Sequence, residues 1–306
     1  MFRRIALPLT LALVVAACGG GTGADTTITT VGSTSAAPAY PVEVAGVTIP
    51  ARPERILSGS ATHTEILFAL GAGDQVAAVD LWSDFPAEIA DLPRFDAFEA
   101  SVEAIADLDP DLVILTFDPG VVDGLAALDI PVLVLDAPTD LDGVFAQYSD
   151  IAVAIDRVDE AATLITEMRS EIDDIIASLP QTLRESTYYH ELDPSFYSVT
   201  SDTFLGSVYG VLGLTSIADG TGESGYPQLS PEFVIDSNPD FVFLAHTTWS
   251  GDSPDAVAQR PGWESLSAVL GGRVVAVDEG LSSRWGPRIV EYMRSIADVV
   301  LAVAVP

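Results

Sequence analysis

The sequence predicts an α/β protein with two similar lobes, each built on a parallel sheet, and one long helix that joins them. Three observations support this fold. Short apolar runs alternate with helical stretches through most of the chain, which is typical of parallel α/β sheets. Residues 141–179 keep one helical period, with a single seven-residue gap. Finally, the segment Ser101–Leu115 reappears, in altered form, in the second half of the chain.

The first half contains four short apolar runs. Loops that carry Asp, Pro or Gly bound each run, so we expect strands. Helical stretches lie between them, and the first of these ends at Gly71. The predicted strands are Arg55–Ser58, Val76–Val79, Leu112–Leu115 and Val132–Leu135, and the predicted helices are Thr62–Leu70, Ser101–Leu108 and Val121–Leu128. Together they predict an N-terminal α/β lobe over residues 47–139.

Residues 140–180 form the predicted connecting helix. Apolar residues recur there in steps of three and four, which indicates an amphipathic helix. Asp140 or Asp142 can cap its start, and Pro180 ends it. A continuous helix of this length would measure about 57 Å, at about 1.5 Å per residue, and would run down the side of two lobes. A kink near Asp156 and Arg157 would weaken that inference.

The α/β alternation returns over residues 181–306, the predicted C-terminal lobe. Its segment Ser230–Leu244 aligns without gaps on Ser101–Leu115, and seven of the fifteen positions are identical. Capping chemistry explains the shared serine and glutamate, but it does not explain a shared length through to the end of the strand. We therefore expect two similar lobes. The predicted strands are Ser186–His190, Phe241–Leu244 and Val274–Val277, and the predicted helices are Phe204–Leu212, Ser230–Ser237 and Arg288–Val303.

The N-terminus has the three parts of a secretory signal: two arginines, an apolar run over residues 5–17, and small residues before Cys18. The run is shorter than the ~20 residues that span a bilayer as a helix. Val15–Cys18 resembles a bacterial lipobox, in which the cysteine receives lipid, and Cys18 is the only cysteine in the chain. We expect a signal peptide over 1–17 and, because residues 18–46 are mostly small and polar, a flexible linker there.

Composition excludes several functions. The chain has no lysine, and the part after residue 17 has 11 arginines against 45 acidic residues, a net charge of −34. Such a surface repels nucleic acid. A phosphate loop of the Gly-x-x-x-x-Gly-Lys type needs lysine, and no Gly-x-Ser-x-Gly nucleophile elbow occurs. We therefore expect no enzyme activity, no catalytic residues and no cofactor.

Candidate binding residues follow from the rule that ligands lie beside the carboxyl ends of parallel strands. The residues at those places, and on loops before the two similar segments, are mostly aromatic and carry few charges. Such linings bind large apolar ligands, with a few polar groups fixing the orientation. The candidates are Trp82, Phe98, Phe117, His190, Tyr226, His246, Trp249, Arg284 and Trp285.

All three histidines, His63, His190 and His246, fall near strand ends. Three imidazoles and a carboxylate can hold Zn²⁺ or Mn²⁺, so a metal-binding receptor is an alternative. No His-x-x-x-His pair supports it, and His63 lies at a helix start, where it can simply cap or pack. We assign no metal ligand.

Six segments, in chain order, resemble the cobalamin and ferric-siderophore periplasmic binding proteins, the class III substrate-binding lipoproteins of ABC importers. They are Arg55–Asp80, Trp82–Pro86, Val102–Ile105, Pro110–Ile114, Pro227–Val234 and Arg284–Ile289. The resemblance covers nearly all of the chain after residue 50. It implies two Rossmann-like lobes joined by a single long helix, with the ligand in the cleft between them. It also implies a membrane permease with a cytoplasmic ATPase as partner.

The resemblance implies roles for particular residues. One surface glutamate on each lobe docks arginines of the permease, and the matching positions are Glu103 and Glu232. Contacts to a corrinoid match Trp82, Tyr226 and Arg284. Two positions depart from the corrinoid binder, because a ligand-stacking tryptophan falls near Ala97 or Phe98 and a ligand-contacting aspartate falls at Gly280.

The sequence thus predicts a lipid-anchored, extracytoplasmic receptor at the cell membrane, a monomer that captures a corrinoid or a ferric siderophore. Few arginines are available to meet an anionic siderophore; the candidates are Arg94, Arg284 and Arg288. An aromatic site with little positive charge favours a corrinoid or another bulky, nearly neutral chelate. A Zn²⁺ or Mn²⁺ receptor and an extracytoplasmic enzyme are the alternatives.

Overall fold

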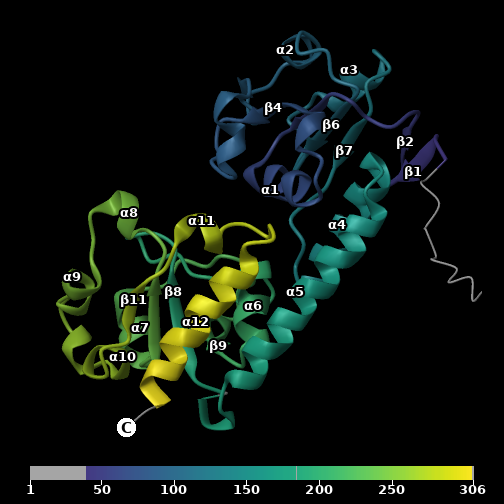
Figure 1. Ribbon diagram of the computed structural model, residues 1–306. Coiled ribbons are helices and arrows are strands. Elements are labelled where there is room, and N and C mark those ends of the chain that lie inside the picture. The colour runs from purple at the N-terminus through teal and green to yellow at the C-terminus, as the bar shows by residue number, and fades with distance from the viewer. Residues whose placement is uncertain (1–38, 184, 305–306) are drawn as a thin grey trace, which may run out of the picture. The chain divides into compact units, whose positions relative to one another are not determined.

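The computed structural model describes residues 39–183 and 185–304, which form two parallel sheets with helices around them (Figure 1). The predicted signal peptide, Cys18 and most of the predicted linker lie outside these residues. Within the described ranges, no helix is both long and apolar enough to cross a membrane.

The N-terminal lobe is built on a five-stranded parallel sheet with the strand order β5-β4-β3-β6-β7. Both faces of this sheet are covered. In β6, Leu112 and Ile114 pack on the side of α1, whereas Val113 and Leu115 pack on the side of α2 and α3. The elements are β3 (Ile56–Ser58), α1 (Ala61–Ala69), β4 (Val76–Asp80), β5 (Arg94–Phe95), α2 (Val102–Ala106), β6 (Leu112–Leu115), α3 (Val122–Ala126) and β7 (Val132–Val134).

The C-terminal lobe is built on a four-stranded parallel sheet with the order β11-β10-β8-β9. Its faces alternate in the same way: Phe241 and Phe243 of β10 join one core cluster, and Val242 and Leu244 join another. The elements are β8 (Thr187–Glu191), α6 (Phe204–Val211), β9 (Thr215–Ser216), α7 (Pro231–Ser237), β10 (Phe241–Leu244), α8 (Thr247–Ser250), α9 (Pro254–Ala258), α10 (Ser267–Leu270), β11 (Val274–Ala276), α11 (Glu279–Ser282) and α12 (Ile289–Ala304).

The two sheets share one topology. Strands β4-β3-β6-β7 of the first correspond in order to β9-β8-β10-β11 of the second. The similar segments recognised in the sequence are α2 with β6 and α7 with β10, at corresponding places. The prediction of an α/β fold with two parallel-sheet lobes is therefore confirmed.

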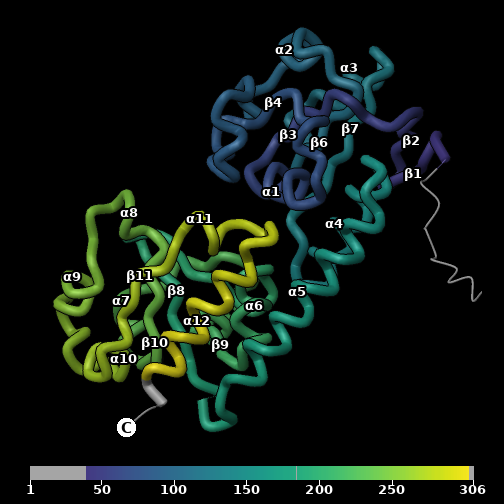
Figure 2. Tube along the Cα trace, viewed as in Figure 1, coloured from purple at the N-terminus to yellow at the C-terminus, as the bar shows by residue number. Residues whose placement is uncertain are grey.

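The prediction of one continuous connecting helix over 140–180 is wrong. It is two helices, α4 (Leu141–Ile155) and α5 (Val158–Ser178), separated at Asp156 and Arg157 (Figure 2). Asp156 adopts the left-handed conformation (φ 60°), which aspartate tolerates better than most residues. The backbone N–H groups of Asp156 and Arg157 both point back to the carbonyl of Ala152 and close the helix end.

Helices α4 and α5 lie side by side and run in opposite directions. Arg169, in the middle of α5, donates to Asp142 at the start of α4 (2.8 Å) and lies over the ring of Phe145. Arg157 begins α5 against the N-terminal lobe, where it donates to the carbonyl of Gly71, and the helix continues beside α12 of the C-terminal lobe. Only α5, of about 31 Å at about 1.5 Å per residue, therefore joins the lobes in the predicted sense.

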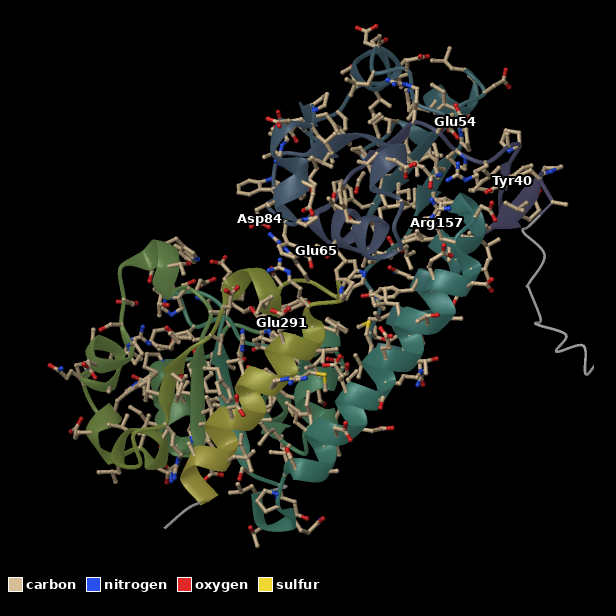
Figure 3. The ribbon with its side chains drawn as sticks, viewed as in Figure 1. Tyr40, Glu54, Glu65, Asp84, Arg157 and Glu291 are labelled. Atoms are coloured by element: carbon tan, nitrogen blue, oxygen red, sulfur yellow. The ribbon has the colours of Figure 1, made fainter. Side chains whose placement is uncertain are left out.

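The folded body begins before residue 47, so the end of the predicted linker over 18–46 is also wrong. β1 (Val42–Val44) and β2 (Val47–Ile49) form an antiparallel hairpin. The hydroxyl of Tyr40 (labelled in Figure 3) donates to the carbonyl of Ala154 in α4. Val44 is buried in the large core cluster. Tyr40 and Val44 therefore anchor residues 40–46 to the folded body, although most of the residues around them in the sequence are small or polar.

Candidate functional site

A cleft of about 920 Å³ lies where the carboxyl ends of the two sheets meet, near the upper end of the range for small-molecule sites. Residues of both lobes line it. They are Gly59, Ser60, Ala61, Thr62, Asp80, Trp82, Asp84, Phe98, Thr116, Thr248, Trp249, Asp278, Glu279, Gly280, Ser283, Arg284 and Trp285. The rule that placed candidates at strand ends therefore finds this cleft.

Two exposed tryptophans face the cleft from different lobes. Trp82 follows β4 and is 69% exposed, and Trp249 lies on α8, after β10, and is 56% exposed. Phe98 also lines the cleft and packs against Phe117, with ring centroids 5.1 Å apart. Phe117 is half-buried and supports Phe98 without lining the cleft. Aromatic rings this exposed have unused apolar surface, which a flat or bulky ligand can cover.

Trp285 lines the cleft and contacts three helices, α1, α4 and α6. Its indole N–H donates to the side-chain oxygen of Gln147 in α4 (3.0 Å). Its ring meets His63 of α1 and Phe204 of α6 edge-on, at 6.3 and 6.4 Å. Trp285 therefore touches the N-terminal lobe, the C-terminal lobe and the helix pair at once, so a ligand that packs on it contacts the junction of all three.

Arg284 lines the cleft, but its guanidinium is already engaged. Nη1 lies 3.1 Å from Glu65 Oε1, and Nη2 lies 3.1 Å from Asp84 Oδ2. Glu65 is a buried residue of α1 that also receives two bonds from Arg288. The bonds from Arg284 hold the pKa of Asp84 below its usual value. Arg284 therefore bridges the lobes in the structure described.

The other candidates lie elsewhere. His190 and His246 are fully buried and do not line the cleft. His190 bonds to the hydroxyl of Tyr209, and His246 bonds to Glu191. Tyr226 is exposed but lies outside the cleft lining.

The three histidines do not form a metal site in the described part of the chain. Burial lowers the pKa of His63 to about 4 and, with help from His246, that of His190 to about 3, so both are neutral at pH 7. The only group of described residues with metal-ligand spacing is Glu191, His246 and Asp252. Arg260 donates two bonds to that same Glu191, at 2.6 and 2.8 Å, so a cation already occupies the carboxylate.

Glu103 and Glu232 lie in the first turns of α2 and α7, and both are exposed. Ser101 and Ser230 cap these helices through the backbone N–H of Ala104 and Phe233. The two glutamates thus occupy equivalent places on the two lobes. Neither takes part in an ion pair among the described residues.

The sequence pattern did not single out three polar residues, Glu65, Asp84 and Gln147, which make the bonds that fix Arg284 and Trp285. Arg288, which the sequence offered only as a partner for an anionic ligand, bonds to Glu65 instead. A signal for Glu65 existed, because an acid followed directly by the apolar run Ile66–Leu70 must either face solvent or find a cation. Its arginine partners lie more than two hundred residues away along the chain, so no local pattern shows them.

Comparison with known proteins places residues 56–281 in a family model described as periplasmic binding protein. An uncharacterised ABC transporter substrate-binding lipoprotein of Bacillus subtilis is 28% identical over 83% of this chain and 82% of its own length. A cobalamin-binding protein of Halobacterium salinarum is 30% identical over 82% of this chain and 70% of its own length.

Among solved structures, a possible iron-binding periplasmic solute-binding protein of Staphylococcus epidermidis superposes with a TM-score of 0.73 at 26% identity. The match covers 82% of this chain and 99% of that protein. These similar proteins are described as binders of solutes, and none of the three is described as an enzyme.

Proposed function

The chain belongs to the periplasmic binding protein family, and we propose that it is the substrate-binding lipoprotein of an ABC importer that captures a corrinoid or a ferric siderophore. It is a solute-binding protein of the class III fold and not an enzyme. The observation that carries the ligand proposal is the large cleft between two lobes, with an exposed tryptophan on each side.

A bulky chelate suits this cleft better than a small solute. Trp82 and Trp249 offer broad apolar surfaces, whereas a bare ion needs converging polar ligands. A corrin ring or a wrapped ferric chelate presents apolar faces of comparable size. One relative is described as cobalamin-binding, which supports a corrinoid, and a similar solved structure is described as possibly iron-binding, which supports an iron-containing ligand.

Delivery to a permease follows from the same proposal. Glu103 and Glu232 are the proposed contacts for permease arginines, since they are exposed, unpaired among the described residues and equivalent on the two lobes. Lipid on Cys18 would keep the receptor at the extracytoplasmic face of the membrane. Cys18 lies outside the described residues, so its sequence context carries this proposal.

Ligand titration tests the proposal. Three of the four tryptophans line the cleft, so binding of cyanocobalamin or a ferric hydroxamate should quench the intrinsic fluorescence strongly. Trp82→Ala and Trp249→Ala should each weaken binding by about tenfold or more in calorimetry, because each removes a large apolar contact. Leu270→Ala, at an exposed position outside the cleft, is the control and should bind as wild type does. Absence of binding by both cyanocobalamin and ferric siderophores would refute the proposal.

A further inference from the structure

The charges around the cleft are one-sided. Among the residues that the structure describes, four carboxylates line it, Asp80, Asp84, Asp278 and Glu279, and Arg284 is the only basic residue in its lining. The chain as a whole is also strongly acidic. A ligand that enters this cleft therefore meets a negative potential unless Arg284 is free to counter it.

Arg284 is not free. Glu65 and Asp84, both in the N-terminal lobe (Figure 3), hold its guanidinium from two sides, and Nη2 also points to the carbonyl of Trp82 at 3.4 Å. The pair with Glu65 is well shielded from water, because the Glu65 side chain is 2% exposed and that of Arg284 is 14% exposed. An anionic ligand group would have to draw Arg284 away from a buried carboxylate, which would leave that carboxylate short of a partner.

Arg288 further stabilises Glu65, the buried partner of Arg284. It donates to both oxygens of Glu65, at 2.6 and 3.1 Å, and its guanidinium lies over the ring of Phe85. Glu65 therefore serves two arginines, and Arg284 in turn serves two carboxylates. Because these four side chains satisfy one another, none of them offers an unpaired charge to a ligand.

We propose that Glu65 and Asp84 are specificity-determining residues, which neutralise Arg284 so that the cleft takes bulky chelates of neutral or net positive charge and rejects those with a free carboxylate. The inference rests on the proposed function and narrows its ligand class. The remaining carboxylates accept hydrogen bonds, so amide-bearing ligands such as corrinoids suit the lining.

Matched ligand pairs test this selectivity. One pair is cyanocobalamin and its monocarboxylate, in which one side-chain amide is a carboxylate. The other is a cationic ferric hydroxamate with a free amine and its succinylated, anionic form. The first pair keeps its size and changes its charge, whereas succinylation also adds an acyl chain, so the cyanocobalamin pair is the stricter comparison. Wild type should bind the more positive member of a pair at least about tenfold more tightly in calorimetry, because like charges repel in a partly desolvated cleft.

The variants are Asp84→Asn and Glu65→Gln, which keep shape and remove charge. Each should reduce the preference at least about threefold by releasing Arg284. Asp142→Asn is the matched control, since Asp142 also pairs with an arginine but lies outside the cleft lining, and it should keep the wild-type ratio. Thermal unfolding checks that each variant folds; Asp84 is the more exposed of the two acids, so its variant is the safer one.

The outcomes separate the two proposals. If neither pair binds, the proposed function fails, and the charge rule fails with it. If pairs bind but wild type treats both members alike, or prefers the anion, the charge rule alone is wrong. If both variants shift the affinity for both members equally, Glu65 and Asp84 only hold the lobes together, and their role in specificity is refuted.

Discussion

Close to Trp249 in the C-terminal lobe lies a buried polar cluster. Glu191 and His246 are fully buried, and they bond at 2.8 Å. Arg260 reaches Glu191 with both of its terminal nitrogens. His246 precedes α8, the helix that carries Trp249, and its ring lies 6.1 Å from that indole. A buried carboxylate so close to a binding wall is tolerated only because it is fully paired.

Arg260→Ala should therefore destabilise the protein by about 3 kcal/mol, since it leaves Glu191 buried beside a single imidazole. Urea unfolding followed by circular dichroism measures the loss. The double variant Glu191→Gln, Arg260→Ala should recover part of it, because no unpaired charge remains. Together with the single variant Glu191→Gln, these variants complete a double-mutant cycle, which gives the coupling between the two side chains. A loss below about 1 kcal/mol for Arg260→Ala would mean that the pair behaves like an exposed one.

Four aromatic candidates from the sequence line the cleft together with Arg284, whereas the partners that hold Arg284 and Trp285 were not among the candidates. Trp82, Phe98 and Trp285 lie in polar loops and Trp249 lies on the short helix α8, where a large aromatic ring has little core to enter. His190 lies within β8, where alternation decides which of the two covered faces of the sheet a side chain joins, and here it joins Tyr209. The pairing of Arg284 with Glu65 depends on the packing of α1 against the segment before α12. A local sequence pattern does not show that packing.

The ends of helices and strands could be predicted where polar residues cap a helix or bind the backbone of a neighbouring strand. Asp109 and Asn238 both adopt the left-handed conformation after α2 and α7. The aspartates that follow, Asp111 and Asp240, accept backbone N–H groups at the start of the neighbouring strands β3 and β8. The similarity of Ser101–Leu115 and Ser230–Leu244 thus has a physical basis. Each segment ends a helix and supplies an aspartate that binds the backbone of the adjacent strand. The break at Asp156 lacks a proline or glycine, so the apolar period predicted one helix across it, although Asp156 and Arg157 were named as the place where a kink would weaken that prediction.

Equivalent elements on two lobes also predict a paired docking surface. Reversing both charges, with Glu103→Arg and Glu232→Arg, should abolish uptake of the ligand by cells, since two arginines would face the arginines proposed for the permease. Ligand affinity should stay within about twofold of wild type, because neither residue lines the cleft. Uptake and calorimetry on the same variant separate docking from binding.

The matched control for docking reverses two exposed acids elsewhere, Glu160 and Glu291, and should leave uptake intact. The pair also controls for the change in net charge, which is the same in both double variants. Normal uptake by the Glu103→Arg, Glu232→Arg variant would rule out these two residues as the permease contacts.

The whole molecule carries far more carboxylates than arginines can pair, 45 against 13, with no lysine. Mutual repulsion among the unpaired acids opposes the compact state. Added salt screens that repulsion, since the Debye length falls from about 10 Å at about 0.1 M to about 3 Å at about 1 M. The buried pairs of Glu65 and Glu191 are screened much less, so salt should help more than it harms.

The melting temperature should accordingly rise by about 4 °C or more between about 0.1 M and about 1 M sodium chloride, a gain of roughly 1–2 kcal/mol for a body of this size. Differential scanning calorimetry at pH 7 measures it. Most of the rise should come at the lower salt concentrations, because screening saturates, whereas a general exclusion of solute from the surface would grow steadily with concentration. Sucrose at matched osmolality separates these causes, since it excludes without screening. A melting temperature that falls with salt would mean that the ion pairs between the lobes, rather than the surplus of surface acids, dominate the electrostatic free energy of the folded state.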